Sequence, residues 1–233
     1  MSGSGPKISQ RLPTLSAEKA NEMDIPRPER TVERNYIEKS VSYDAYKQLV
    51  EHLLAAGKVT GPQQSEALMH YSQLNLQRMH RVEKTIQLIP EVKEKLLPLH
   101  QPQIWLVLTE GWCGDASQSV PVMQALANVN PNIRLRILLR DENPELMDRY
   151  LTNGTSRSIP KLIALDPDTG KELFTWGPRP TALQETFYGM RSEGLSYDVI
   201  KEELQRWYNK DRAVTIQQEL ATLATGGLLP GQQ

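Results

Sequence analysis

The feature that most constrains this chain is an unbroken apolar run, Ile104-Trp105-Leu106-Val107-Leu108, which ends five residues before the single cysteine, Cys113. Such a run is typical of a strand buried on both faces, as in a parallel sheet. Residues 115–128 then carry apolar groups at helical spacing. The sequence therefore predicts that Cys113 lies where a buried strand meets a helix. The positive end of that helix favours a thiolate, so we expect the pKa of Cys113 to fall below the free value of about 8.5.

Strand and helix patterns alternate along the rest of the chain. Further strands are predicted over 133–139, 161–165 and 172–176, the last two joined by a tight turn. Further helices are predicted over 143–151, 183–190, 197–208 and 214–223. This order indicates an α/β fold with a central mixed sheet covered by helices on both faces.

The segment before the first strand predicts a helical extension. Apolar residues recur at helical spacing from Tyr43 to Leu54 and again from Ser65 to Ile86, which favours two helices packed as a hairpin. We therefore expect four parts: a disordered or loosely ordered tail, the helical extension, an α/β domain, and a C-terminal helix with its tail. Their predicted bounds are 1–40, 41–100, 101–210 and 211–233.

Composition narrows the possible functions. The 27 basic and 28 acidic side chains give a net charge of −1, so no global field favours nucleic acid or an anionic membrane. No apolar run is long enough for a membrane span and the opening residues lack the apolar centre of a secretory signal, so we expect a cytoplasmic protein. The four histidines show no ligand spacing, which implies neither a metal nor a cofactor. Nothing in the sequence predicts an oligomeric state.

Several motifs resemble the thioredoxin family. Trp112-Cys113-Gly114, with Pro121 eight residues beyond the cysteine, is similar to that family's active-site segment. Ser158-Ile159-Pro160-Lys161-Leu162 resembles its Ile-Pro segment, in which a cis proline lies against the reactive cysteine, and Gly177 resembles a glycine that borders its substrate groove. The resemblance covers about 103–192. It implies a thioredoxin-like fold, a reactive Cys113, and substrate contacts at Trp112, Gly114, Ile159, Pro160 and Gly177.

The chain departs from the family pattern at two positions, and both affect the same half-reaction, in which a second cysteine resolves the mixed disulfide. Ala116 occupies the position of the family's second, resolving cysteine, and Val107 replaces a buried acid that assists that cysteine. The chain's only thiol cannot form an internal disulfide. Cys113 could still attack a disulfide, but release would need glutathione or a thiol of another protein.

The sequence leads to three hypotheses about function. The first hypothesis is thiol-disulfide exchange or mixed-disulfide formation by Cys113 with protein or low-molecular-weight thiols, without a resolving cysteine. The alternative is a redox-inactive thioredoxin-fold module that binds proteins. A monothiol glutaredoxin is disfavoured, because that family has a lysine shortly before the cysteine, whereas this chain has Thr109-Glu110-Gly111.

Overall fold

A four-stranded mixed sheet forms the centre of the protein, in a computed structural model that describes residues 29–229. The strand order is β2-β1-β3-β4; β1 and β2 run parallel, and the other neighbours are antiparallel. The strands are β1 (Gln103–Thr109), β2 (Ile133–Leu139), β3 (Lys161–Leu165) and β4 (Glu172–Trp176). Every residue of β1 and β3 is buried, because these are the two central strands. The predicted fold class is confirmed.

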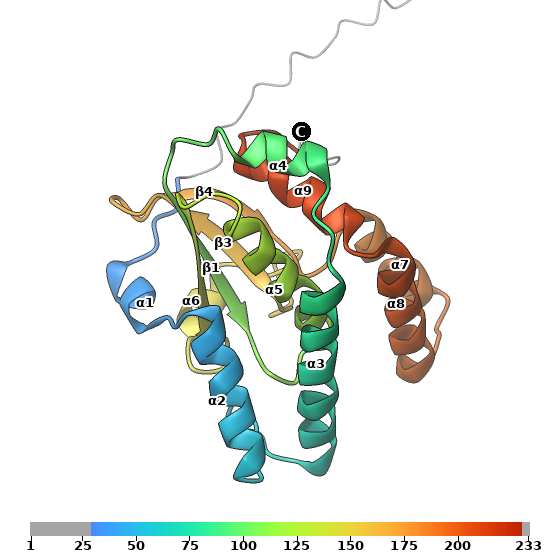
Figure 1. Cartoon of the computed structure of the whole chain (residues 1–233). Helices are drawn as coiled ribbons and strands as arrows, with labels where there is room; N and C mark the ends of the chain where they lie inside the picture. The colour runs from blue at the N-terminus through green and yellow to red at the C-terminus, as the bar shows by residue number, and fades with distance from the viewer. Residues whose placement is uncertain (1–28, 230–233) are drawn as a thin grey trace, which may run out of the picture.

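Helices cover both faces of this sheet (Figure 1). They are α1 (Arg34–Lys39), α2 (Tyr43–Ala55), α3 (Glu66–Thr85), α4 (Pro90–Leu96), α5 (Gly114–Ala127), α6 (Pro144–Asp148), α7 (Thr181–Ser192), α8 (Tyr197–Asp211) and α9 (Val214–Ala224). Three of these helices begin with a capping serine: Ser42 for α2, Ser65 for α3 and Ser196 for α8. Each serine side chain accepts a hydrogen bond from a backbone N–H in the first turn of its helix. The helix predicted over 143–151 is shorter than expected and ends at Asp148.

The two long helices before the sheet contact each other and the domain. Glu83 on α3 accepts hydrogen bonds from the Tyr43 hydroxyl at 2.6 Å and from Lys47 Nζ at 2.8 Å, both on α2. Helix α3 also packs against α5, which begins directly after Cys113. The extension therefore forms one wall of the region around the cysteine.

Of the tail predicted over 1–40, residues 1–28 lie outside the part of the chain that the structure describes. From residue 29 the chain lies against the sheet: Thr31 bridges to Lys171 beside β4, and Val41 bridges to Ile137 on β2. Val32 between them is 1 % exposed, and its N–H donates to the Gly170 carbonyl at 2.9 Å. Burial of this valine gives the segment an apolar anchor.

Helix α9 packs into the core. Ile216 and Leu220 are fully buried, and the Glu219 carboxylate accepts from Trp176 Nε1 at 2.7 Å. In the described part of the chain, no helix combines the length and apolar character needed to cross a membrane.

Candidate functional site

Cys113 lies at the start of α5, opposite a cis peptide bond. The turn after β1 is closed by the Cys113 N–H, which donates to the Glu110 carbonyl at 3.1 Å and leaves Cys113 as the N-cap of α5. Its Sγ lies 3.2 Å from the Ile159 carbonyl oxygen, to which the S–H donates. The Ile159–Pro160 bond is cis. The fold thus brings together Cys113, Ile159 and Pro160, which are far apart in sequence.

The thiol at this site is protonated at neutral pH. Cys113 is 8 % exposed, and its burial, followed by the nearby charge of Asp115, raises its pKa to about 12. The N–H groups of Ala116 and Asp115 and the charge of Arg179 act in the opposite direction but are outweighed. The expectation of a pKa below about 8.5 is therefore wrong, because desolvation of a buried thiolate exceeds the stabilisation available at a helix start.

A largely buried ion pair with some solvent exposure borders the cysteine. Asp115 Oδ2 lies 2.6 Å from Arg179 Nη2, and Asp115 Oδ1 accepts from the Tyr208 hydroxyl of α8 at 2.9 Å. Burial raises the pKa of Asp115, while Arg179 and Tyr208 lower it. Arg179 also lies over the ring of Phe187, with its Cζ 4.2 Å from the ring centroid. These contacts hold the Asp115 carboxyl group close enough to the Cys113 sulfur for its charge to raise the pKa of the thiol.

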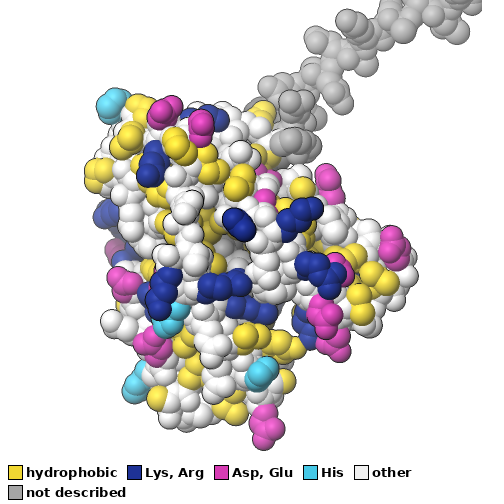
Figure 2. Space-filling view, turned by 45° about the vertical axis from the view of Figure 1, so that its right-hand side comes forward, with side chains coloured by type: hydrophobic (Ala, Val, Ile, Leu, Met, Phe, Trp, Pro, Cys, Tyr) yellow, Lys and Arg dark blue, Asp and Glu magenta, His cyan; other side chains and the backbone are white. Residues whose placement is uncertain are grey.

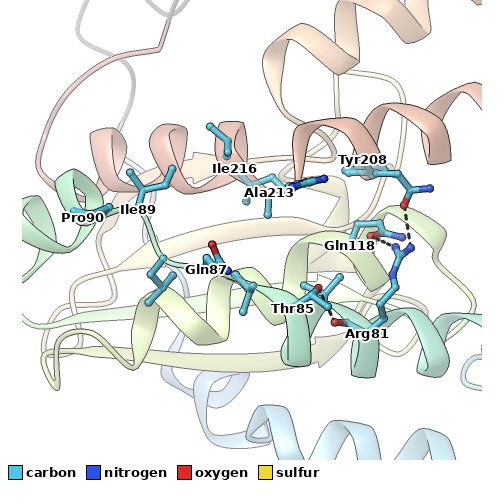
Figure 3. Close-up of a pocket in the computed structure, with 15 residues that line it drawn as sticks. Arg81, Thr85, Gln87, Ile89, Pro90, Gln118, Tyr208, Ala213 and Ile216 are labelled. Carbon is cyan, nitrogen blue, oxygen red and sulfur yellow. Dashed lines mark hydrogen bonds between the residues drawn. The ribbon is translucent and has the colours of Figure 1, made fainter.

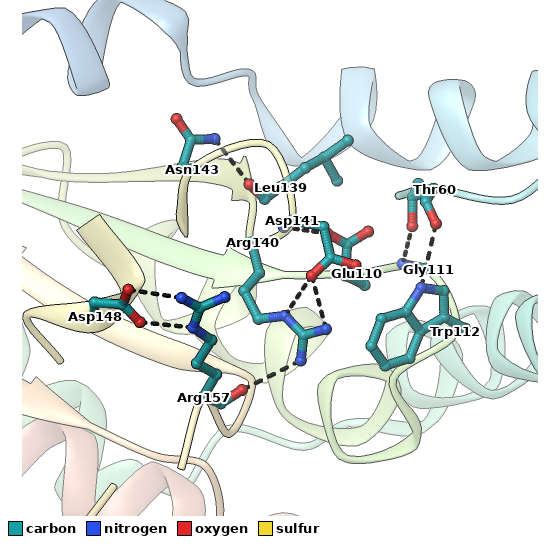
Figure 4. A network of polar contacts seen from close by, with 10 residues as sticks. All are labelled: Thr60, Glu110, Gly111, Trp112, Leu139, Arg140, Asp141, Asn143, Asp148 and Arg157. Carbon is teal, nitrogen blue, oxygen red and sulfur yellow. Dashed lines mark hydrogen bonds and ion pairs between the residues drawn. The ribbon is translucent and has the colours of Figure 1, made fainter. Parts of the chain in front are cut away.

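Trp112 is fixed by the loop before α3 and by the end of β2. Its Nε1 donates to the Thr60 carbonyl at 3.2 Å, and the Arg140 guanidinium lies over its ring, 4.9 Å from the centroid. Figure 4 shows Thr60 also accepting from the Gly111 N–H, at 2.9 Å. On the other side, Glu110 accepts the Asp141 N–H at 2.9 Å, and burial raises the pKa of this glutamate.

Gly177 lies against the cis proline. Its φ is +108°, and a Cβ at this position would lie 2.3 Å from the Pro160 carbonyl oxygen, so only glycine fits without a shift. Its own carbonyl accepts from Lys161 Nζ at 3.1 Å, and burial lowers the pKa of that lysine to about 8. A second cis bond, Gly177–Pro178, follows. The backbone of Gly177 therefore packs directly against the backbone of Pro160.

Of the six residues expected at the site, Trp112 and Gly114 line a cleft. Ile159 and Pro160 are buried, and the Ile159 carbonyl is engaged by Cys113. The cleft has a volume of about 990 Å³ and opens between α3 and α8. Figure 2 shows a hollow on this face with Lys and Arg side chains gathered around it.

Sequence reasoning missed the residues that α3 and α8 contribute. Arg78 on α3 lies beside Gly114, because a Cβ built on that glycine would be 3.6 Å from Arg78 Nη1. Asn75 on the same helix donates to the Gly111 carbonyl at 3.1 Å, and Tyr208 reaches Asp115 from α8. These contacts join distant segments, so no local pattern indicates them. Within residues 29–229, no three His, Cys, Asp or Glu side chains gather as a metal ion would need.

Comparison with known proteins supports the fold seen here. A family model described as thioredoxin matches residues 61–194, which is more than half of the chain. No curated protein matches. A solved protein of unknown function from Pseudomonas aeruginosa is 18% identical, with a TM-score of 0.55 and coverage of 84% of this chain and 99% of that one.

An HIV epitope-scaffold is 17% identical, with a TM-score of 0.49 and coverage of 81% of this chain and 100% of its own. At this identity the Pseudomonas structure shows the fold alone, whereas the family match spans β1, Cys113, the cis Pro160 and β4. The chain belongs to the thioredoxin family.

Proposed function

We propose that this chain is a thioredoxin-fold binding protein in which Cys113 is a structural thiol and not a nucleophile at neutral pH. The observation that carries the proposal is the buried S–H group, which donates to the Ile159 carbonyl over 3.2 Å. Its burial raises the pKa of the thiol. At pH 7 such a thiol is protonated. Disulfide exchange needs the thiolate, so its rate would be negligible.

The departures from the family pattern agree with this proposal. Ala116 at the resolving position and Val107 at the position of the buried acid remove the release half-reaction. Asp115, two residues after Cys113, adds a negative charge that disfavours the thiolate further. Recognition is then assigned to the open part of the site, where Trp112 and Gly114 border the cleft between α3 and α8.

Thiol-disulfide exchange is the second candidate, and specific contacts favour it. The sulfur lies against the cis Ile159–Pro160 bond, and the N–H groups of Asp115 and Ala116 stabilise its negative charge. The Cys113 thiolate would attack one sulfur of a disulfide, form a new S–S bond, and expel the other sulfur, which takes a proton from water. Because Ala116 cannot resolve the mixed disulfide, glutathione or another protein's thiol would release it.

The two candidates differ in how Cys113 is alkylated as pH changes. We expect iodoacetamide to label the folded protein more slowly than N-acetylcysteine at pH 7.5, with a rate that still increases above pH 10. Labelling in urea controls for the intrinsic reactivity of the same cysteine. An inflection at or below pH 8.5, with labelling faster than that of the free thiol, would falsify the binding-protein proposal and favour exchange.

A further inference from the structure

The cleft between α3 and α8 carries more positive charge than its acidic residues balance. Its lining includes four cations, Arg78, Arg179, Lys201 and Arg206, against three acids, Asp115, Asp198 and Glu202. An adjoining cavity of about 670 Å³ is lined by Arg81 and Arg212 and by no acidic residue. The two cavities share Tyr208 and Asn209 of α8, so they lie next to each other along that helix, and together they are called the groove below. Figure 2 shows the resulting band of Lys and Arg side chains across this face.

Three of these cations already have carboxylate partners. Arg179 pairs with Asp115 at 2.6 Å, Lys201 pairs with Asp198 at 2.7 Å, and Arg206 pairs with Glu203. Their charges are therefore largely neutralised within the chain. A cation beside a carboxylate attracts an anionic ligand less than a cation without such a partner does.

Arg78 and Arg81 differ, since within residues 29–229 neither pairs with a carboxylate. Arg78 Nη1 donates to Asn75 Oδ1 at 3.1 Å. Arg81 donates to Asn209 Oδ1 at 3.0 Å and to Gln118 Oε1 at 3.4 Å; Figure 3 shows it reaching from α3 toward Gln118. Both guanidinium groups are thus held in place by neutral amides and keep their full charge.

These two arginines also repel each other. They are three residues apart on α3, so they project from the same face of the helix on successive turns. Burial and then the charge of Arg81 lower the pKa of Arg78, and the charge of Asp115 offsets this only in part. An anion placed between them would relieve this repulsion. A carboxylate brings one negative charge, whereas a phosphate monoester brings about −1.5 to −2 at pH 7 and suits the planar donors of arginine.

We propose that this groove binds a small phosphorylated molecule, with the phosphate held by Arg78 and Arg81 and the organic part against Tyr71 and Trp112. The inference deepens the proposed function, on whose binding cleft it rests, by naming the class of ligand. The aromatic side chains border the same cavity as Arg78, and its volume of about 990 Å³ suits a small organic ligand.

Calorimetric titration with phenyl phosphate at low ionic strength tests the proposal. We expect the full chain to bind it, and Arg78→Gln and Arg81→Gln each to weaken binding about tenfold or more. Arg134→Gln makes the same charge change on an exposed residue of β2 and should leave the affinity within about twofold. Inorganic phosphate and benzoate, titrated separately, show whether the phosphate group or the ring supplies the affinity.

Three outcomes would overturn the inference: no binding of phenyl phosphate, equal binding of benzoate, or binding that both arginine variants leave unchanged. Since Arg81 is exposed, its variant tests the site without disturbing the core. Cys113→Ser should bind as the natural protein does. Rapid alkylation of Cys113 alongside arginine-dependent binding would refute the structural-thiol proposal alone. Slow alkylation without binding would refute the phosphate site alone.

Discussion

At Cys113, burial and the start of a helix act on the same thiol in opposite directions. A helix terminus stabilises a charge by about 0.3–2 kcal/mol, whereas full burial can shift a pKa by about 3–5 units, each worth about 1.4 kcal/mol. The buried Ile159 carbonyl adds to this, because it accepts a hydrogen bond only from the protonated thiol. Burial therefore determines the ionisation state of Cys113.

Asp115→Asn should lower the pKa of Cys113. The Asp115 carboxylate is the largest cause of the raised pKa after burial, and its removal also leaves Arg179 without its partner beside the sulfur. Each unit by which the pKa falls increases the thiolate fraction at neutral pH about tenfold. The alkylation rate of Cys113, measured from pH 7 to 11, reports this shift.

The matched control is Asp148→Asn. Asp148 is an exposed aspartate that pairs with Arg157 at 2.6 Å. Alkylation of Cys113 should keep its pH profile in this variant. If Asp115→Asn likewise left the profile unchanged, the electrostatic role given to Asp115 would be wrong.

Gly177→Ala should destabilise the fold by about 1–3 kcal/mol. The added methyl group would lie 2.3 Å from the Pro160 carbonyl oxygen, at a φ of +108° that alanine rarely adopts. Urea unfolding measures the change. Gly189→Ala is the control, because that glycine lies within α7 with open space around it, and alanine should stabilise the helix by about 0.5–1 kcal/mol.

Some residues of this site could be predicted from the sequence, and others could not. Cys113 and Trp112 follow a buried strand, so their placement at the start of α5 could be read from local pattern. The contact between Cys113 and Ile159 came from a family resemblance, since no spacing along the chain implies it. Arg78 and Tyr208 could not be predicted, because their roles depend on how α3 and α8 pack beside α5.

At the scale of elements, prediction succeeded where a pattern was long enough to show a period. The buried strand β1 and the capped helices α2, α3 and α8 lie where their sequences indicate. Helices α1 and α4 were not predicted, because 6 and 7 residues are too few for a helical period to show. Pro121 is accommodated within α5, although proline normally interrupts a helix.

The contact between α2 and α3 should weaken in acid. Burial would raise the pKa of Glu83, but hydrogen bonds from Lys47 and Tyr43 outweigh it and leave the pKa below its ordinary value. A carboxyl group with a lowered folded-state pKa stabilises the protein above its unfolded pKa of about 4.3. That contribution is lost as pH falls through the folded-state pKa.

Glu83→Gln should therefore reduce the free energy of unfolding by about 1 kcal/mol at pH 7. The difference from the natural protein should shrink as pH falls through the lowered folded-state pKa of Glu83, because below it Glu83 is protonated in both states. Urea unfolding at several pH values measures this. Glu94→Gln, an exposed change on α4, should have no effect at any pH, and a pH-independent loss in Glu83→Gln would contradict the ionic account.

At the scale of the whole molecule, the cooperative unit extends beyond the family match. One apolar core joins Tyr46 of α2, Leu106 of β1 and Leu220 of α9. The match covers 61–194 and so omits α2 and α9, both of which bury apolar side chains in that core. The stability of the site should therefore depend on segments outside the matched region.

Leu220→Ala should lower the free energy of unfolding by about 2–5 kcal/mol, since it leaves a cavity at a fully buried position of α9. Tryptophan fluorescence reports on four residues, none of them in α9: Trp105 and Trp176 of the sheet, Trp112 beside Cys113, and Trp207 of α8. Far-UV circular dichroism reports on all helices. Because a single core joins these elements, both signals should shift to the same lower midpoint. Leu228→Ala, at a leucine that is 60% exposed, should change neither midpoint. Separate midpoints for the two signals would show that α9 unfolds independently of the sheet, and the single cooperative unit would then be refuted.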